Sequence, residues 1–442
     1  MKRFYRFMSL VIAIAMIAAF TGCSSGSTAS TPTSQGNADS TASSSPAKEQ
    51  VIKWPCIWVG TDSKAPVIAE LVEEFNTANA GKIKVVIEES PNYDDYRDKI
   101  RTSVVAGSFP DFFTLDQVDM NAFIESDKLM DFTPLLEESY KAGFTPGIFD
   151  GITGSDGKTK VVPYEKAVTV FMYNKDLLKK VGYDEFPRTF DEMFVMFDKM
   201  VAAGIAPTSQ MTAANAWTSQ LWFSYIITAI GGPDIIEKAD FSDPAWVEAA
   251  KIMQTLYSKY TTSDAVGATA SVAGGHYLNG DTAILANGTW YFGRLASEGI
   301  PGLSENTSVT VIPQYTGGKG EPGSVIGATL AYFAAAKTDD KDRENAIFEW
   351  VRFLTKPENI KRLSVSSGSL FHITTDLGDE ISPMLKETLA LLDKAPAFIN
   401  HFDATMPLTV VNEQPMALSA LVTGEATPEE YIARLQTALD KS

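Results

Sequence analysis

Tryptophans beside polar residues are the side chains of this sequence best suited to bind a polar organic molecule. Trp217 and Trp222 stand in "NAWTSQLWFS", and Trp290 follows a glycine turn in "NGTWYFG". A Trp ring stacks on the apolar face of a sugar while neighbouring polar groups bind its hydroxyls. These three residues are therefore candidate ligand contacts. Trp54, Trp246 and Trp350 lie inside strand or helix patterns and are expected in the core, while Trp58 fits either role.

Catalytic signatures are weak in comparison. The chain contains no HExxH, no CxxC pair and no GxxxxGK[ST], and its three histidines are far apart, which weakens a histidine triad or metal site without excluding one. Its GxSxG lies in the polar segment near the N-terminus, where no strand-to-helix turn is expected. Paired carboxylates such as Asp94 and Asp95 fit a solvated helix face. We therefore expect no catalytic residues, no metal and no cofactor.

The elements that must position a site alternate between strand and helix. Strand patterns at 51–60, 82–90 and 110–116 enclose helix patterns at 66–79 and 93–107. This alternation predicts an α/β fold with a mostly parallel sheet covered on both faces, which binds ligands beyond the carboxyl ends of its strands. The residues at those ends are Thr61, Asp62 and Lys64 after the first strand, and Asp116 and Gln117 after the third.

The C-terminal segment has the signals of a docked helix. Thr427 is suited to cap the helix, Pro428 takes its first position, and Glu430 completes a capping box. Tyr431, Leu435 and Leu439 form its apolar stripe. Cys56, inside an apolar strand pattern, is expected to be an inert core residue.

The N-terminus has the pattern of a secretory signal. Lys2, Arg3 and Arg6 precede an apolar run at 10–20 that is too short to span a bilayer. The residues around Cys23, "FTGC", resemble the lipobox of bacterial lipoproteins, which implies cleavage after residue 22 and a lipid on Cys23. An ordinary secretory signal is the alternative. Residues 23–50, rich in Ser and Thr, are expected to be a flexible tether.

The net charge of the chain limits the classes of molecule that it can bind. The formal net charge of −18 repels nucleic-acid phosphates, and no dense Lys/Arg cluster opposes it. Apolar residues make up 45% of the chain and charged residues 21%, as in globular proteins. We therefore exclude nucleic acid as a partner.

Segments in a characteristic order make the chain resemble the family 1 extracellular solute-binding proteins, the maltose-binding-protein-like lipoproteins that capture substrates for sugar ABC importers. The resemblance runs from about Val51 to the C-terminus. It is carried, in order, by "SFPDFFTLD", "VVPYEKAVTVFMYNKDLLKKVGYDEFPRTFDEMFVMFDKM", "YLNGDTAILANGTWYFGRL", "GATLAYFAAA" with "AIFEWVRFLTKPENI", and "TGEATPEEYIARLQTALD".

The resemblance implies a two-lobed clamshell, of the type II periplasmic-binding-protein kind, that closes on its ligand. Lobe 1 would comprise 51–165 and 328–372, and lobe 2 would comprise 166–327 and 373–442. Ligand contacts would come from Thr61, Asp62, Lys64, Asp116, Gln117, Glu165 and Trp290, with Trp217, Trp222 and Asp403 from neighbouring loops. The implied protein is a monomer, anchored by lipid to the extracytoplasmic face of the cell membrane, that delivers a mono- or oligosaccharide to ABC permease subunits.

Other functions fit part of the same pattern. A lipid-anchored extracellular glycoside hydrolase would also use aromatic residues and carboxylates, but the order of the segments favours the importer family. The same fold also carries polyols or glycerol phosphates, and it serves as a sensory partner of membrane receptors.

Overall fold

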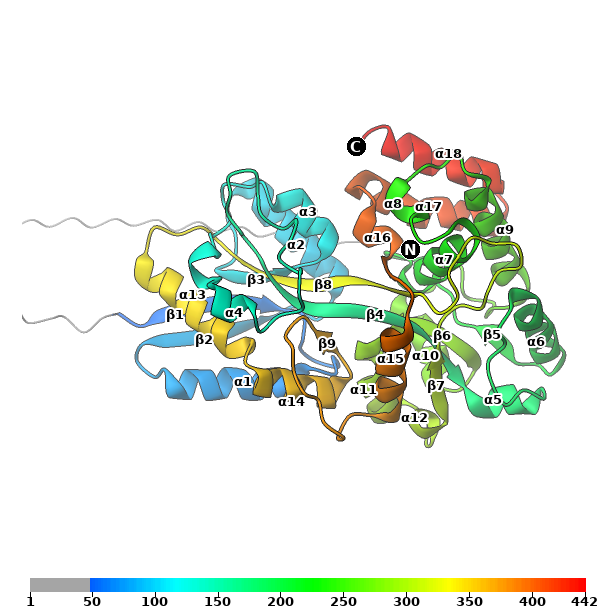
Figure 1. Ribbon diagram of the computed structural model, residues 1–442, viewed down its shortest axis with the longest axis horizontal. Helices are drawn as coiled ribbons and strands as arrows, with labels where there is room; N and C mark the ends of the chain where they lie inside the picture. The colour runs from blue at the N-terminus through cyan, green and yellow to red at the C-terminus, as the bar shows by residue number, and fades with distance from the viewer. Residues whose placement is uncertain (1–47) are drawn as a thin grey trace, which may run out of the picture. The chain divides into compact units, whose positions relative to one another are not determined.

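The computed structural model describes residues 48–442 (Figure 1). The expected signal peptide, Cys23 and most of the expected tether lie outside the described residues. The strands are β1 (Gln50–Cys56), β2 (Ile83–Glu89), β3 (Phe112–Leu115), β4 (Val162–Asn174), β5 (Ala206–Thr208), β6 (Thr282–Gly288), β7 (Thr307–Thr310), β8 (Val325–Ala335), β9 (Leu370–Phe371) and β10 (Phe398–Asn400).

Helices make up much of the rest. In chain order they are α1 (Ala65–Ala78), α2 (Tyr93–Ala106), α3 (Gln117–Phe123), α4 (Glu138–Lys141), α5 (Lys175–Lys180), α6 (Phe190–Ala202), α7 (Trp217–Gly231), α8 (Ile235–Lys238), α9 (Pro244–Lys259), α10 (Ala270–Leu278), α11 (Phe292–Glu298), α12 (Leu303–Asn306), α13 (Lys341–Leu354), α14 (Pro357–Ser367), α15 (Pro383–Lys394), α16 (Phe402–Thr405), α17 (Leu408–Thr423) and α18 (Pro428–Leu439). Short 3₁₀ helices are η1 (Thr133–Leu135) and η2 (Thr289–Tyr291).

The N-terminal β-α-β-α-β order is confirmed. β1 pairs in parallel with β2, starting with Gln50 opposite Ile83, one residue before the predicted start of the folded part. Helix α1 buries the side chains of Val67, Ile68, Leu71 and Phe75, which recur at helical spacing and form the expected apolar face.

The prediction of a mostly parallel sheet is wrong for the larger sheet. β4 pairs antiparallel with β6, β7, β8 and β9, and β3 pairs antiparallel with β8, while β8–β10 and β5–β6 are parallel. The start of β4 pairs with the end of β8 near β3, and the end of β4 pairs with β6 and β7. The long strands β4 and β8 therefore connect the elements around β1–β3 with those around β5–β7 (Figure 1).

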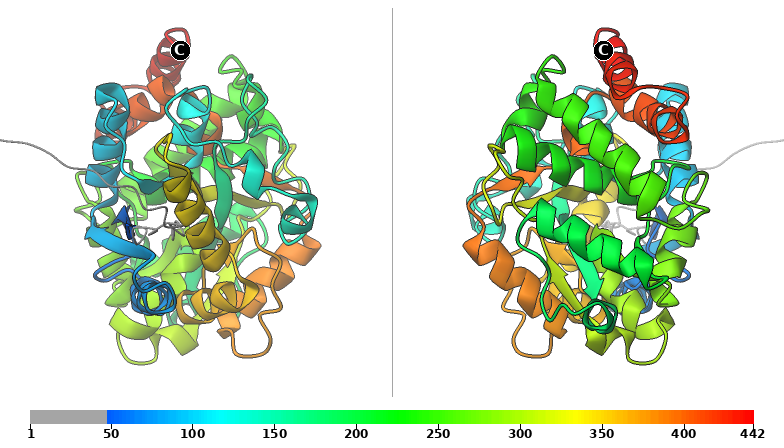
Figure 2. Two further views of the ribbon diagram at one scale, coloured as in Figure 1. Left: turned by 90° about the vertical axis from the view of Figure 1, so that its left-hand side faces the viewer. Right: turned by 90° about the vertical axis from the view of Figure 1, so that its right-hand side faces the viewer.

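Separate hydrophobic clusters form around the two ends of these long strands. The first core contains Trp54, Trp58 and Trp350, and the ring centroid of Trp54 lies 5.7 Å from that of Trp350. The second core contains Trp222 and Trp246. Helices cover the strands at both ends, with α13 against β1 and α7 against β6 (Figure 2). The expected core positions of Trp54, Trp246 and Trp350 are thus confirmed.

The C-terminal helix has the predicted cap. Thr427 Oγ1 accepts from the Glu430 N–H at 3.1 Å, and Glu430 Oε2 accepts from the Thr427 N–H at 2.8 Å. Tyr431 and Leu435 are fully buried, which docks α18 on the second core. Cys56 is buried and unbridged, as expected, and burial raises the pKa of its thiol. Within residues 48–442, no helix combines the length and apolar character needed to cross a membrane.

Candidate ligand-binding site

The first group of predicted site residues lies where the turn after β1 meets β4. Lys64 Nζ donates to Glu165 Oε1 at 3.1 Å and lies 3.6 Å from Asp62 Oδ1. The side chains of Lys64 and Glu165 are 2% and 1% exposed, whereas that of Asp62 is 28% exposed. Thr61 is exposed in the turn. Of the three charged residues, Asp62 is the one that presents its carboxylate to solvent.

The ammonium and the carboxylates of this group influence each other's pKa values. Burial alone would lower the pKa of Lys64, but the carboxylates of Asp62 and Glu165 outweigh burial and raise it. Burial raises the pKa of Glu165 against the opposing effect of Lys64. The backbone N–H of Lys64 also donates to Asp62 Oδ1 at 2.8 Å. Lys64 is therefore a positively charged support that fixes Asp62, and its ammonium faces inward.

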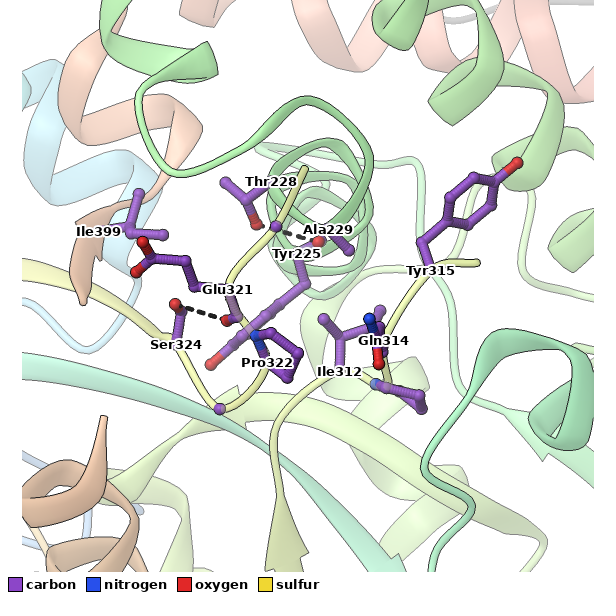
Figure 3. A pocket seen from close by; sticks show the side chains of 13 residues that line it. Tyr225, Thr228, Ala229, Ile312, Gln314, Tyr315, Glu321, Pro322, Ser324 and Ile399 are labelled. Carbon is purple, nitrogen blue, oxygen red and sulfur yellow. Dashed lines mark hydrogen bonds between the residues drawn. The ribbon is translucent and has the colours of Figure 1, made fainter. Parts of the chain in front are cut away.

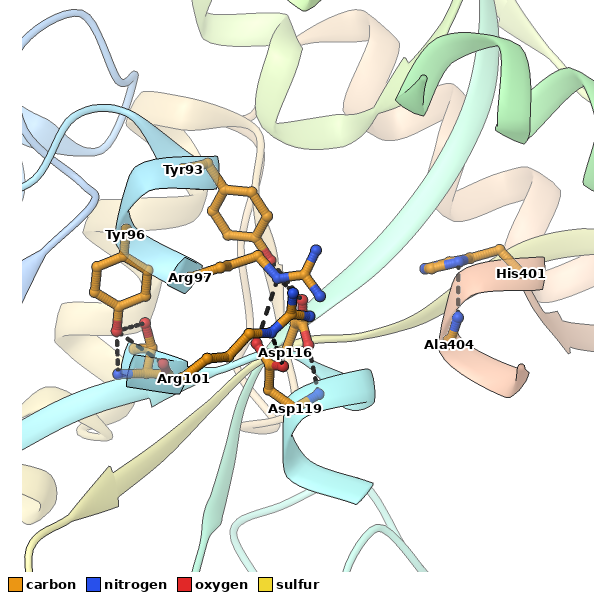
Figure 4. Close-up of polar contacts among 9 residues, drawn as sticks. Tyr93, Tyr96, Arg97, Arg101, Asp116, Asp119, His401 and Ala404 are labelled. Atoms are coloured by element: carbon orange, nitrogen blue, oxygen red, sulfur yellow. Dashed lines mark hydrogen bonds and ion pairs between the residues drawn. The ribbon is translucent and has the colours of Figure 1, made fainter. Parts of the chain in front are cut away.

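A second polar group surrounds Asp116 at the end of β3 (Figure 4). Asp116 caps α3 by accepting from the Asp119 N–H, and its Oδ2 accepts from Tyr93 Oη at 2.9 Å. Arg97 Nε lies 2.9 Å from Asp116 Oδ2 and 3.3 Å from Asp119 Oδ2. Arg101 Nε donates to Asp119 Oδ1 at 2.7 Å. The Asp116 carboxylate is thus held by a tyrosine and an arginine from α2.

Aromatic rings from three segments form the third group. The Trp217 ring lies 6.0 Å from that of Trp290 and 5.2 Å from that of His401. Trp217 Nε1 donates to Asn287 Oδ1 at 3.4 Å. A Cβ on Gly288 would lie 2.0 Å from the Trp290 ring, so only glycine there lets the ring fold back over the chain. Trp290 and Trp217 are both partly exposed, as a stacking surface requires.

The turn after β1 touches this aromatic group directly. Ser63 Oγ donates to the Trp290 carbonyl at 2.9 Å. A Cβ on Gly293, at the start of α11, would lie 2.7 Å from Ser63 Cβ, so the two segments approach closely. This contact brings the Asp62 loop and the Trp290 loop to one place.

Helix α16 supplies groups that face the Asp116 cluster. α16 lies beside α3, and the His401 ring extends toward Arg97 and Asp116 (Figure 4). His401 Nδ1 accepts from the Ala404 N–H at 3.2 Å, which leaves Nε2 as the donor of the neutral ring. Burial lowers the pKa of His401 to about 4, opposed by the Asp116 charge, so the ring is neutral at pH 7.

Gln220 of α7 binds the Asp403 side chain, because its Nε2 donates to Asp403 Oδ1. Burial raises the pKa of Asp403 to about 7, while the Gln220 hydrogen bond and the Arg97 charge oppose the rise. Burial alone would lower the pKa of Arg97, but nearby carboxylates, chiefly Asp116 and to a smaller extent Asp403, raise it.

Two other predicted residues, Trp222 and Gln117, have side chains that are already packed or hydrogen-bonded within the protein. Trp222 is 1% exposed, and its ring packs edge-on against Phe171 with centroids 4.4 Å apart, which makes it a core residue. Gln117 accepts from Tyr332 Oη at 2.5 Å and donates to Asn121 at 3.1 Å, so its amide is already occupied.

Several polar residues of this region were not among the predicted contacts: Ser63, Tyr93, Arg97, Gln220 and His401. One signal was available for α2. Tyr93, Arg97 and Arg101 recur every four residues and so share a helix face. The next strand after α2 is β3, and Asp116 follows it directly.

A separate small pocket contains none of the predicted site residues (Figure 3). It lies at the C-terminal end of α7, and its volume of about 20 Å³ has room for about one water molecule. Its lining includes Tyr225, Thr228, Gln314, Tyr315, Glu321 and Ile399. The candidate site, at Asp62, Asp116 and the Trp217–Trp290 pair, is thus distinct from this pocket.

Comparison with known families gives a match over most of the chain. Residues 60–361 match the model of the bacterial extracellular solute-binding protein family. The sn-glycerol-3-phosphate-binding periplasmic protein UgpB of Brucella abortus is 25% identical over 240 residues, which are 52% of this chain and 53% of the relative. The chain thus spans about half the length of that relative. UgpB of Salmonella typhimurium is 25% identical over 406 residues, covering 85% of this chain and 88% of the relative.

Solved structures show the same fold. A structure from work on xylan utilization by Caldanaerobius polysaccharolyticus has a TM-score of 0.79 at 21% identity and covers 88% of this chain and 99% of its own. A chitin oligosaccharide binding protein has a TM-score of 0.80 at 18% identity, covering 89% and 98%. Maltose-bound MalE3 of T. maritima has a TM-score of 0.72 at 21% identity, covering 88% and 99%. Because the family model matches residues 60–361, the chain belongs to the bacterial extracellular solute-binding protein family.

Proposed function

We propose that this protein captures a mono- or oligosaccharide outside the cytoplasm and delivers it to the permease of an ABC importer, without covalent chemistry. The observation that carries the proposal is the partly exposed Trp217–Trp290 pair, which lies beside the Asp62 loop. Aromatic faces with nearby carboxylates suit the apolar and hydroxyl faces of a sugar.

The proposed lobes are 51–165 with 328–372, and 166–327 with 373–442. The separate hydrophobic cores support this division, because Trp54 and Trp350 belong to one core and Trp222 to the other. β4 and β8 would form the hinge, and opening would separate α16 from α3, which lie side by side here. Lipid attachment at Cys23, a monomeric state and the extracytoplasmic face of the membrane belong to the same proposal.

Among the predicted contacts, we retain Asp62, Asp116, Trp290, Trp217 and Asp403 as ligand-facing candidates. Lys64 and Glu165 would act through the position of Asp62, because their charged groups bind each other in the interior. Thr61 is free to contact a ligand at the rim, Gln117 would have to leave Tyr332, and Trp222 would support the site from the core.

A thermal-shift screen of the purified protein against mono- and oligosaccharides tests the proposal, because a ligand that binds only the folded state raises the melting temperature. Trp290→Ala should abolish the shift. Trp222→Phe is the matched control: it should lower the melting temperature of the free protein while the sugar affinity of the folded state stays the same. No shift with any sugar would refute carbohydrate capture.

Glycerol phosphate is a second candidate ligand, because the alignment with UgpB of Salmonella typhimurium, an sn-glycerol-3-phosphate-binding protein, covers 85% of this chain. sn-Glycerol 3-phosphate therefore belongs in the same screen. A shift with this compound and with no sugar would replace the carbohydrate proposal. Cleavage of an oligosaccharide during incubation would instead favour a glycoside hydrolase.

A further inference from the structure

Arg97 is a charged residue near the candidate site, and one nitrogen of its guanidinium group is bound by no described residue. Its side chain is 12% exposed and lies over the Tyr93 ring, with the guanidinium carbon 5.6 Å from the ring centroid. Its Nε is bound by Asp116 and Asp119, whereas its Nη2 is buried and has no hydrogen-bond partner among the described residues. A buried donor without a partner is costly, so a ligand oxygen at this position would gain a strong hydrogen bond.

The Arg97 guanidinium is held in place by its neighbours. Asp119 is 2% exposed and binds both Arg97 and Arg101, so it acts as a fixed anchor beneath the two arginines. Tyr93 Oη and the Arg97 Nε both reach Asp116 Oδ2. The acceptor Asp116 and the donor Arg97 are therefore side by side with little freedom to rearrange.

The charges of this cluster balance. Two guanidinium groups, those of Arg97 and Arg101, face two carboxylates, those of Asp116 and Asp119. Asp403 of α16 is buried, and at its pKa of about 7 it is partly ionised at neutral pH. An anionic ligand group would find no excess of positive charge here. An uncharged group that both donates and accepts hydrogen bonds fits a neighbouring carboxylate and guanidinium.

We propose that Arg97 is a specificity-determining residue that, with Asp116, binds two adjacent hydroxyl groups of an uncharged sugar. One hydroxyl donates to the Asp116 carboxylate, and the next accepts from Arg97 Nη2. His401 and Asp403 close over the same hydroxyls from α16. The inference rests on the proposed function and adds the charge and the hydroxyl pattern of the substrate.

Isothermal titration of the purified protein with maltose, xylobiose, N,N′-diacetylchitobiose and sn-glycerol 3-phosphate tests this assignment. At least one neutral sugar should bind the unmodified protein. Arg97→Met should weaken that sugar by about 10- to 100-fold, the usual range for a hydrogen bond to a charged group. Arg101→Met is the matched control, because Arg101 Nη2 is also buried without a partner among the described residues, but Arg101 pairs with Asp119 and not with Asp116. Its affinity is expected within about threefold of the unmodified protein, and a loss equal to that of Arg97→Met would overturn the assignment to Arg97. Arg97→Lys replaces Arg97→Met if that variant does not fold.

Monodeoxy analogues of the sugar that binds separate a contact from a structural role. One analogue should bind the unmodified protein much more weakly than the parent sugar does, and this difference should vanish in Arg97→Met. Unchanged deoxy effects, or full sugar affinity in Arg97→Met, would overturn the assignment while leaving carbohydrate capture intact. Binding of sn-glycerol 3-phosphate through Arg97 would overturn the uncharged class. Failure of these compounds and of every sugar in the thermal-shift screen would instead refute the proposed function, and this inference with it.

Discussion

Breaking the buried Lys64–Glu165 pair should cost the protein several kilocalories of stability. Both side chains are almost fully buried, Nζ and Oε1 are 3.1 Å apart, and Glu165 Oε2 has no hydrogen-bond partner among the described residues. Lys64→Met would leave the Glu165 carboxylate in the interior without its counter-charge. Removal of one partner from a buried pair costs about 3–5 kcal/mol, because the remaining charge is uncompensated.

The loss should depend on pH. Burial already raises the pKa of Glu165, and without Lys64 it would rise further. A raised carboxyl pKa means that the folded state keeps its proton longer than the unfolded state. The stability tied to this proton is fully present at low pH and is lost as pH rises through the folded pKa. The destabilisation by Lys64→Met should therefore be larger at pH 8 than at pH 5.

Urea unfolding followed by tryptophan fluorescence measures the effect. The double variant Lys64→Met/Glu165→Leu should recover most of the loss, because a buried pair replaced by apolar groups is often neutral. Lys238→Met, which removes an exposed pair with Asp234, is the control and should change the free energy of unfolding by less than about 0.5 kcal/mol. A Lys64→Met variant within about 1 kcal/mol of the unmodified protein at pH 8 would refute the reasoning.

Two further perturbations test other parts of the structure. Asp403→Asn removes a carboxyl whose pKa burial raises to about 7 and whose unfolded value is about 4. The unmodified protein should therefore lose roughly 2–3 kcal/mol from this group between pH 5 and pH 8, and the variant should not; equal pH profiles in urea unfolding would contradict the assignment. Thr427→Ala should cost about 1 kcal/mol by breaking the capping box of α18, whereas the exposed Thr437→Ala in the same helix should cost less; equal losses would show that the cap does not matter.

Local signals in the sequence were sufficient for much of the fold. The helix at Ala65–Ala78 was predictable because its apolar residues recur at helical spacing, and the cap at Thr427 because side-chain and backbone groups three residues apart meet in any helix. Strand direction was not local in this way. β4 pairs with β8, more than a hundred residues later, so neither segment reveals that the pair is antiparallel.

The candidate site was also only partly predictable from local sequence patterns. Trp217 and Trp222 both belong to α7, where five residues turn the helix by about 140° beyond a full turn, so the two rings point to different sides. Because the residues of α7 are nearly all buried, its pattern does not indicate which side faces a ligand. Arg97 and Asp116 come from consecutive elements, but His401 lies near the other end of the chain. Its position near them depends on the placement of α16 beside α3.

The charge of a ligand cannot be inferred from the net charge of −18, because the charges near the candidate site are paired. Lys64 lies between Asp62 and Glu165, and Arg97 lies between Asp116 and Asp119. Surface carboxylates farther away act through water and salt, which screen them within about 10 Å. The pairing of Lys64 and Arg97 with carboxylates therefore favours an uncharged ligand more strongly than the net charge does. A phosphate would have to compete with the carboxylates that already bind these two side chains.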